Sequence, residues 1–230
     1  MKLYCFGESG HSYKAALALQ FAKIDWTPVF VDFFNGEARS DEYRSQINEM
    51  GEVPVLVDGD TKLTQSGVIQ TYLHSKTGKH GGTNENEKLE ILRWVLWDNH
   101  KFSSVVGNTR FLMNFLPQEK RPQPVIDFNL ARLKGSYSIL EGALTDKNFL
   151  VGDSITHADM TCCSYLYYPE FFGFERSEWP NIDRWLENIS KINTIIFDKT
   201  GTITSSDKTQ ISYEGIELNV DEIKIIKTVL

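Results

Sequence analysis

The chain has few cysteines and no long apolar run, and these two absences exclude several protein classes. Its 230 residues include three cysteines, Cys5, Cys162 and Cys163. An odd number of cysteines without CxxC or CxxH spacing favours neither a disulfide framework nor a zinc site, so we expect no metal. No apolar stretch approaches the roughly 20 residues that cross a bilayer, so we expect no membrane partner.

Positive charge is also scarce. The chain has 24 Lys and Arg against 31 Asp and Glu, a formal net charge of -7. This balance argues against nucleic acid as a partner, because duplex binding needs a basic face that displaces counterions. The start of the chain turns polar by Glu8, so we expect no signal peptide and a cytoplasmic location. The length suits two small domains, each with its own core.

One proline stands at the head of an apolar strand, in Glu52-Val53-Pro54-Val55. A proline has no N–H to donate to a sheet ladder. It therefore leaves the carbonyl and amide of Val53 facing an edge, where an extended peptide can pair as a short additional strand. This segment predicts a site for a peptide backbone.

A second polar feature, Gln65-Ser66, follows the turn that comes after this strand. Ser66 begins a predicted helix that continues through 67–77 and is closed by Gly78. A serine among the free N–H groups of a helix N-terminus is a carboxylate site. A peptide-binding edge beside a carboxylate site suits a small acidic peptide.

Val53-Pro54 followed by Gln65-Ser66 resembles the glutathione-binding half of the glutathione transferases. The resemblance implies that Pro54 is cis and that the backbone around Glu52 and Val53 pairs with the cysteinyl part of glutathione. It also implies that Gln65 and Ser66 hold the γ-glutamyl end. Glutathione is then a co-substrate, and no metal or prosthetic group is required.

The front segment has the element order of a thioredoxin-like α/β domain. The pattern predicts strand, helix, strand, irregular helix, two strands and a helix. The first four lie at 2–6, 12–21, 27–34 and 40–50. We expect this domain to span 1–78, followed by a linker at 79–84 that is rich in glycine and polar residues.

Beyond the linker, the periodicity predicts an all-α domain at 85–192. The expected helices include 85–102, 108–115 and 125–144. Thr156 is a natural N-cap, and Asp159 can reach back to its N–H. This helix start resembles the buried folding motif of the glutathione transferase C-terminal domain. The resemblance, to bacterial-type cytosolic members, covers 1–192 and implies the two-domain architecture of that family.

Glutathione transfer needs a thiolate, which a hydrogen-bond donor near the end of the first strand stabilises. Three residues of the loop before the first helix are candidates: Ser9, Ser12 and His11. Ser9 lies where this loop most closely resembles that of the serine- and threonine-type transferases, so we rank it first. Ser12 is alternatively the N-cap of the helix. His11 stands where some bacterial and fungal relatives have an asparagine donor.

The electrophile is expected between the two domains, above the loop of the first strand. Aromatic side chains there favour flat apolar substrates. The candidate substrate-binding residues are Phe34, Phe102, Arg110 and Phe111, with Asn35 and Tyr165 as further candidates.

The segment 194–230 resembles a different family. Its run IIFDKTGTIT is similar to the phosphorylation motif of P-type ATPases, with Asp198 at the position of the phosphorylated aspartate. Phosphoryl transfer needs further carboxylates for magnesium and a nucleotide site, which so short a segment does not supply. We therefore treat 193–230 as an atypical tail of uncertain fold.

The leading hypothesis is a glutathione transferase that activates the thiol for attack on a small hydrophobic electrophile or for thiol-dependent reduction. The resemblance implies a homodimer and a role in detoxification. The alternative is a non-catalytic module of the same fold that binds a protein partner. A phosphoryl-transfer fusion is a third hypothesis and would incorporate phosphate at Asp198.

Overall fold

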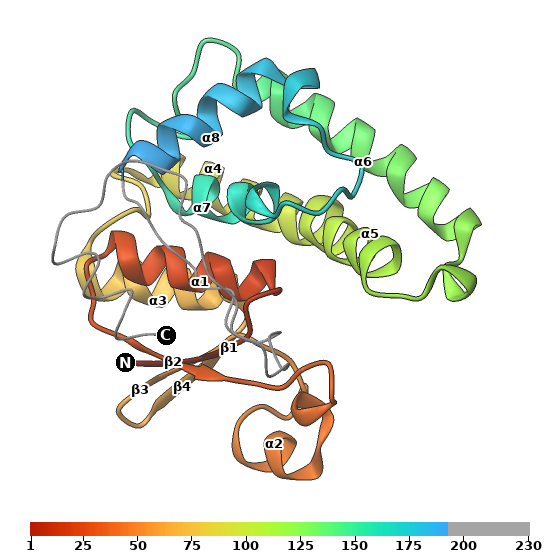
Figure 1. The fold of residues 1–230 in the computed structure, drawn as a ribbon. Coiled ribbons are helices and arrows are strands. Elements are labelled where there is room, and N and C mark those ends of the chain that lie inside the picture. The colour runs from red at the N-terminus through yellow and green to blue at the C-terminus, as the bar shows by residue number, and fades with distance from the viewer. Residues whose placement is uncertain (193–230) are drawn as a thin grey trace, which may run out of the picture.

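The structure is a computed structural model that describes residues 1–192. A four-stranded sheet lies at one side of the molecule, and a helical half lies at the other (Figure 1). Helices α1 and α3 lie between the two (Figure 1). The predicted combination of a thioredoxin-like α/β domain with an all-α domain is confirmed.

The sheet has the strand order β2-β1-β3-β4. Its strands are β1 Lys2–Cys5, β2 Thr27–Phe30, β3 Val55–Asp58 and β4 Thr61–Thr64. β1 pairs with β2 in parallel, and the other two pairings are antiparallel. β2 is shorter than the predicted strand, which extended to Phe34, because the chain turns after Val31, where the Phe33 N–H bonds to the Val31 carbonyl at 2.8 Å.

The helices of this half are α1 Gly10–Phe21, α2 Asp41–Gln46 and α3 Ser66–Thr77, with a 3-10 turn at Glu37–Arg39. α1 has an almost fully buried run of alanine and leucine from Ala15 to Leu19. Gly78 closes α3 with a φ of +69°, a left-handed conformation that glycine adopts at no steric cost. α2 lies on the side away from the helical half (Figure 1).

The helical half consists of five α-helices and shorter turns among the described residues. The α-helices are α4 Glu85–Trp97, α5 Ser103–Asn114, α6 Gln123–Ala143, α7 His157–Cys163 and α8 Pro180–Ile192. The 3-10 turns are Gln118–Lys120, Ser164–Tyr167 and Arg176–Glu178.

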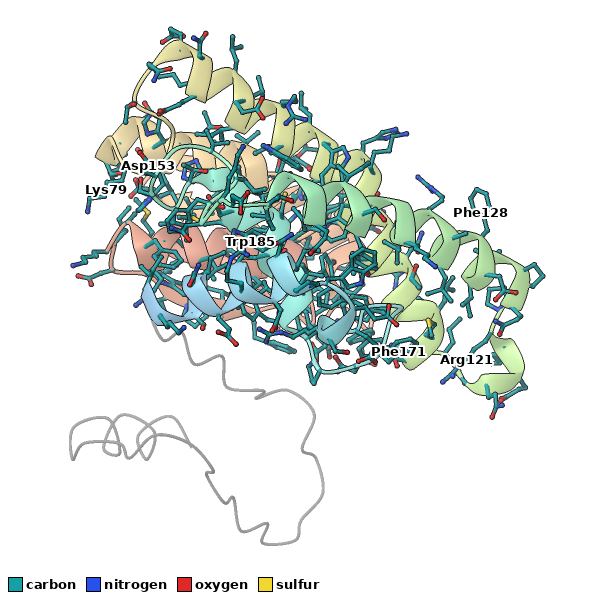
Figure 2. All side chains as sticks on the ribbon, turned by 90° about the horizontal axis from the view of Figure 1, so that it is seen from above. Lys79, Arg121, Phe128, Asp153, Phe171 and Trp185 are labelled. Carbon is teal, nitrogen blue, oxygen red and sulfur yellow. The ribbon has the colours of Figure 1, made fainter. Side chains whose placement is uncertain are left out.

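Asp159 joins three parts of the helical core. One carboxylate oxygen accepts the N–H of Thr156 at 2.8 Å, as the sequence predicted for this helix start. The other accepts the indole N–H of Trp185 at 2.9 Å and the backbone N–H of Leu150 at 2.8 Å. Trp185 lies among the packed helices, whereas Phe128 points outward from α6 (Figure 2).

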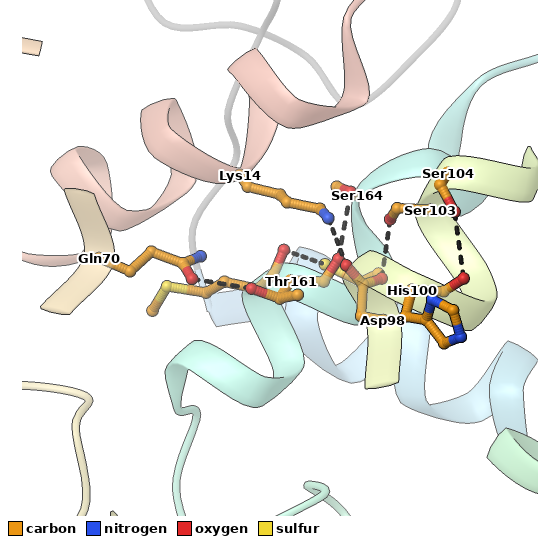
Figure 3. A network of polar contacts seen from close by, with 10 residues as sticks. Lys14, Gln70, Asp98, His100, Ser103, Ser104, Thr161 and Ser164 are labelled. Carbon is orange, nitrogen blue, oxygen red and sulfur yellow. Dashed lines mark hydrogen bonds and ion pairs between the residues drawn. The ribbon is translucent and has the colours of Figure 1, made fainter. Parts of the chain in front are cut away.

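The long helix predicted at 85–102 is interrupted. α4 ends at Trp97, and Asp98–Phe102 form a π turn before α5. Asp98 is fully buried there, where it pairs with Lys14 of α1 and accepts the hydroxyl of Ser103 at 2.7 Å (Figure 3). The π turn therefore accompanies a buried ion pair between the two halves.

Within residues 1–192, no helix is long and apolar enough to cross a membrane. The same residues contain no cluster of three or more His, Cys, Asp or Glu side chains that could hold a metal ion. The ATPase-like segment with Asp198 lies outside the described residues.

Candidate functional site

The three candidates for thiol activation lie on one turn at the N-terminus of α1. Ser9 is the N-cap, and its hydroxyl oxygen accepts the N–H of Ser12 at 3.1 Å. The alternative interpretation of Ser12 as the cap is therefore wrong, because the helix starts at Gly10, two residues earlier than expected. Both serines are buried, and among the described residues the Ser12 hydroxyl has no hydrogen-bond partner.

His11 lies between these serines, and its ring meets the Tyr165 ring edge to face at a centroid distance of 5.9 Å. Burial, with a contribution from the charge of Lys14, lowers the pKa of His11 to about 3. The imidazole is thus neutral at physiological pH and can donate through one nitrogen. The first turn of α1 contains no acidic side chain, so the positive helix end is uncompensated there.

The Val53-Pro54 peptide bond is cis, and β3 follows it directly. Two groups fix the preceding residue: the Tyr43 hydroxyl and the Asn48 amide donate to the Glu52 carbonyl at 3.1 and 2.9 Å. The peptide edge expected at this segment therefore has a well-defined backbone.

Gln65 stands at the turn from β4 into α3 with a φ of +66°. Such a conformation costs a non-glycine residue about 1–3 kcal/mol, and it persists only where neighbours hold it. The Gln65 amide donates to the Glu52 carboxylate at 2.9 Å, which links the two predicted halves of the glutathione site.

Ser66 is the first residue of α3 and is buried. It lies at the edge of a groove of about 760 Å³ between α3 and α4. The apolar part of the groove includes Val68, Leu92 and Leu96, which are 49%, 49% and 61% exposed. The loop that carries Ser9 and His11 does not line this groove.

A separate aromatic cluster joins the two halves beside that loop. Phe34 is 47% exposed and stacks on Phe115 at the end of α5, with centroids 5.2 Å apart. Phe111 is 39% exposed and also stacks with Phe115, with centroids 6.3 Å apart. Phe34 and Phe111 can therefore contact an apolar substrate. Asn35 instead bonds to Asp32 at 2.8 Å.

Two of the predicted substrate-binding residues do not face open space. Phe102 is fully buried and packs between the rings of Trp97 and Tyr137, so it belongs to the core. Arg110 is 3% exposed, and its guanidinium donates to the Glu170 carboxylate and to the Glu8 carbonyl. The Arg110 guanidinium is thus occupied by protein groups from both halves.

Sequence reasoning missed two residues near the candidate loop, Tyr168, which contacts it, and Glu170, which binds Arg110. The Tyr168 hydroxyl donates to the Gly7 carbonyl at 2.6 Å. Glu170 accepts two bonds from Arg110, at 2.9 and 3.2 Å. The tyrosine-rich run YLYY at 165–168 was the available signal, but nothing in its spacing indicates contact with residues near the N-terminus.

Comparisons with known proteins agree across both halves. The family model described as "Glutathione S-transferase, N-terminal domain" matches residues 1–75, and "Glutathione S-transferase, C-terminal domain" matches 109–193. Glutathione S-transferase F14 of Arabidopsis thaliana is 28% identical over 203 residues, which cover 82% of this chain and 78% of the relative.

Two solved structures extend this similarity. Glutathione transferase F2 from Populus trichocarpa has a TM-score of 0.72 at 28% identity, covering 82% of this chain and 92% of the other. Glutathione S-transferase-I bound with lactoylglutathione has a TM-score of 0.69 at 25% identity, covering 83% of this chain and 97% of the other.

Proposed function

We infer that this chain, which belongs to the glutathione S-transferase family, is a glutathione-dependent transferase that forms the thiolate at the N-terminus of α1. The observation that carries the site assignment is the common position of Ser9, His11 and Ser12 on the first turn of that helix. A helix N-terminus and a hydroxyl donor both stabilise a thiolate.

Ser9 is the residue that donates to the thiolate in this proposal. Its oxygen accepts the Ser12 N–H, which orients the hydroxyl and leaves its own proton free to donate. Ser12 and His11 remain the second and third candidates. Lowering a thiol pKa by two units corresponds to about 2.7 kcal/mol.

The peptide part of glutathione pairs with the backbone at Glu52 and Val53, beside Pro54. Gln65 and Ser66 receive its γ-glutamyl end, with the N-terminus of α3 favouring the carboxylate. The Gln65–Glu52 hydrogen bond supports this placement, because it joins the segments that hold the two ends of the ligand. The electrophile lies against Phe34 and Phe111.

The test is calorimetric titration with glutathione, followed by thiolate absorbance near 240 nm as a function of pH. Ser9→Ala should raise the thiol pKa and lower kcat with little change in affinity. Ser66→Ala should weaken binding by about 1–3 kcal/mol through loss of a bond to a charged group. The exposed Ser138 of α6 provides the control, Ser138→Ala.

Equal effects of Ser9→Ala and Ser66→Ala on affinity alone would contradict the division of roles. An unchanged thiol pKa in Ser9→Ala, with a raised value in Ser12→Ala or His11→Asn, would move the donor to that residue. Absence of binding at millimolar glutathione would favour the non-catalytic interaction module instead.

The chain forms a homodimer through α3 and α4 in this proposal. Leu89, Leu92 and Leu96 of α4 are 65%, 49% and 61% exposed, and Val68 of α3 is 49% exposed beside them. An apolar face of this kind marks a protein interface. A cytoplasmic location and a detoxifying role complete the proposal and follow from the family.

A further inference from the structure

The loop between β1 and α1 belongs to the sheet domain but is held from the helical half. Two consecutive carbonyl groups, of Gly7 and Glu8, accept hydrogen bonds from Tyr168 at 2.6 Å and from Arg110 at 2.8 Å. Both carbonyls directly precede Ser9. The position of the proposed thiol donor therefore depends on side chains more than 100 residues away in the sequence.

Neighbouring side chains hold the Arg110 guanidinium in the orientation that this contact needs. Its guanidinium is buried and forms a two-bond ion pair with Glu170, which fixes its plane. The Tyr168 ring lies 3.9 Å from the Arg110 Cζ, so the two donors also support each other. A planar cation in this arrangement has little freedom to move, and its remaining nitrogen points at the Glu8 carbonyl.

The first residue of α1 is held in the same way. Gly10 packs so closely on the Tyr165 ring that an added Cβ would overlap it. Gly107 of α5 approaches Tyr165 from another direction, where an added Cβ would lie 2.8 Å from its hydroxyl. Residues 7, 8 and 10 thus contact the helical half on either side of Ser9.

We propose that Arg110 and Tyr168 are positioning residues that fix the Gly7–Glu8 carbonyls and thereby set the geometry of the thiol donor at Ser9. This inference rests on the proposed function of the loop. Neither side chain touches the thiol. Their loss shifts the donor relative to the sulfur and leaves the glutathione-binding edge at Val53 and Ser66 in place.

The central experiment compares Tyr168→Phe with Tyr167→Phe. The first change removes only the hydroxyl that bonds to Gly7 and keeps the ring beneath Arg110. The second removes an equivalent hydroxyl, which bonds to the Leu186 carbonyl at 2.8 Å in the helical core. Three quantities are measured: amide hydrogen exchange in residues 6–13, the pKa of the bound glutathione thiol, and kcat and KM for glutathione.

Tyr168→Phe should increase exchange in residues 6–13, raise the thiol pKa and lower kcat by about tenfold, because displacement of a catalytic group costs up to about a hundredfold. KM for glutathione should change less than about twofold, because the contacts that bind glutathione are unchanged. Tyr167→Phe should leave all these quantities unchanged, apart from overall stability. Arg110→Lys keeps the charge but loses the planar set of N–H donors of the guanidinium. It should change the exchange, the thiol pKa and kcat in the same direction as Tyr168→Phe.

Increased exchange with an unchanged thiol pKa would overturn the positioning role, and so would equal effects of the two phenylalanine variants. A wild-type protein that binds glutathione but forms no thiolate would overturn the proposed function and this inference together. Normal thiolate formation that is insensitive to both Tyr168→Phe and Arg110→Lys would overturn only the inference.

Discussion

At the scale of single residues, two glycines determine how closely α1 and α5 approach Tyr165. Gly10 has the Tyr165 ring where a Cβ would lie, and Gly107 faces the hydroxyl of the same ring. Helix propensity alone favours alanine over glycine by about 1 kcal/mol within a helix. Glycine is therefore required at these two positions for a steric reason, because the Tyr165 ring occupies the space of a side chain.

Gly10→Ala is expected to destabilise the protein by about 1–3 kcal/mol, because an added methyl group overpacks a filled site. Gly135→Ala in α6 is the matched change, since nothing lies within 4 Å of the added Cβ. That variant should gain about 0.5–1 kcal/mol from backbone entropy. Urea unfolding measures both, and a Gly10→Ala variant as stable as Gly135→Ala would contradict the close packing.

His157 gives the stability a defined dependence on pH. Burial, with contributions from the neighbouring His80 and His74, lowers its pKa to about 3. The unfolded chain binds this proton below about pH 6.5, whereas the folded chain does not, so stability falls as the pH falls from about 6.5 towards 3. At pH 5, this one residue costs about 2 kcal/mol relative to pH 7.

His157→Gln should therefore flatten the loss of stability between pH 7 and pH 5, as measured by urea unfolding at each pH. His100→Gln is the control, because His100 is exposed on the π turn. An identical pH dependence of stability in wild type and His157→Gln would show that the folded chain protonates His157 as readily as the unfolded chain, and would contradict this account.

At the scale of elements, the ion pair of Lys14 with Asp98 connects α1 to the π turn. The exposed fractions of the two side chains are 1% and 0%. Burial raises the pKa of Asp98, and the adjacent Lys14 charge and the Ser103 hydroxyl oppose that rise. Figure 3 shows the pair beside a second polar link, from Thr161 to Gln70 at 2.8 Å.

Lys14→Met is expected to cost about 3–5 kcal/mol, because it leaves a buried carboxylate without its partner. The double variant Lys14→Met with Asp98→Leu should recover most of that loss, since it removes both charges. Lys88→Met is the surface control, as its partner Glu85 is 84% exposed, and it should change stability by less than about 1 kcal/mol. A double variant less stable than Lys14→Met would contradict this account.

The sequence predicts this level of structure well where a local pattern is sufficient. The Thr156–Asp159 helix start and the alternation of helices and strands depend on neighbouring residues, and the structure has both. The interruption at Asp98 could not be predicted, because its partner Lys14 is 84 residues away. The burial of Phe102 and Arg110 could not be predicted for the same reason, because their partners come from other elements.

At the scale of the molecule, the side formed by α3 and α4 carries the exposed apolar face that we propose as the dimer interface. Another apolar side chain, Phe128 on α6, is also 64% exposed, but Arg132 lies 5.7 Å from its ring. The difference between these surfaces gives a direct test of the proposed dimer.

Leu92→Asp should convert the protein from dimer to monomer, because it places a charge in a buried apolar interface. Phe128→Asp should leave the assembly unchanged. Sedimentation velocity of the full chain measures both masses. A dimeric Leu92→Asp variant, or a monomeric wild type, would contradict an interface on this face.

The hydrogen bond from Tyr168 to Gly7 also constrains the order of events during biosynthesis. It joins positions 161 residues apart, so it cannot form until nearly the whole helical half has left the ribosome. Closing so long a loop also carries an entropic cost, which grows slowly with loop length. A nascent chain with a complete sheet therefore still lacks that contact to its candidate catalytic loop.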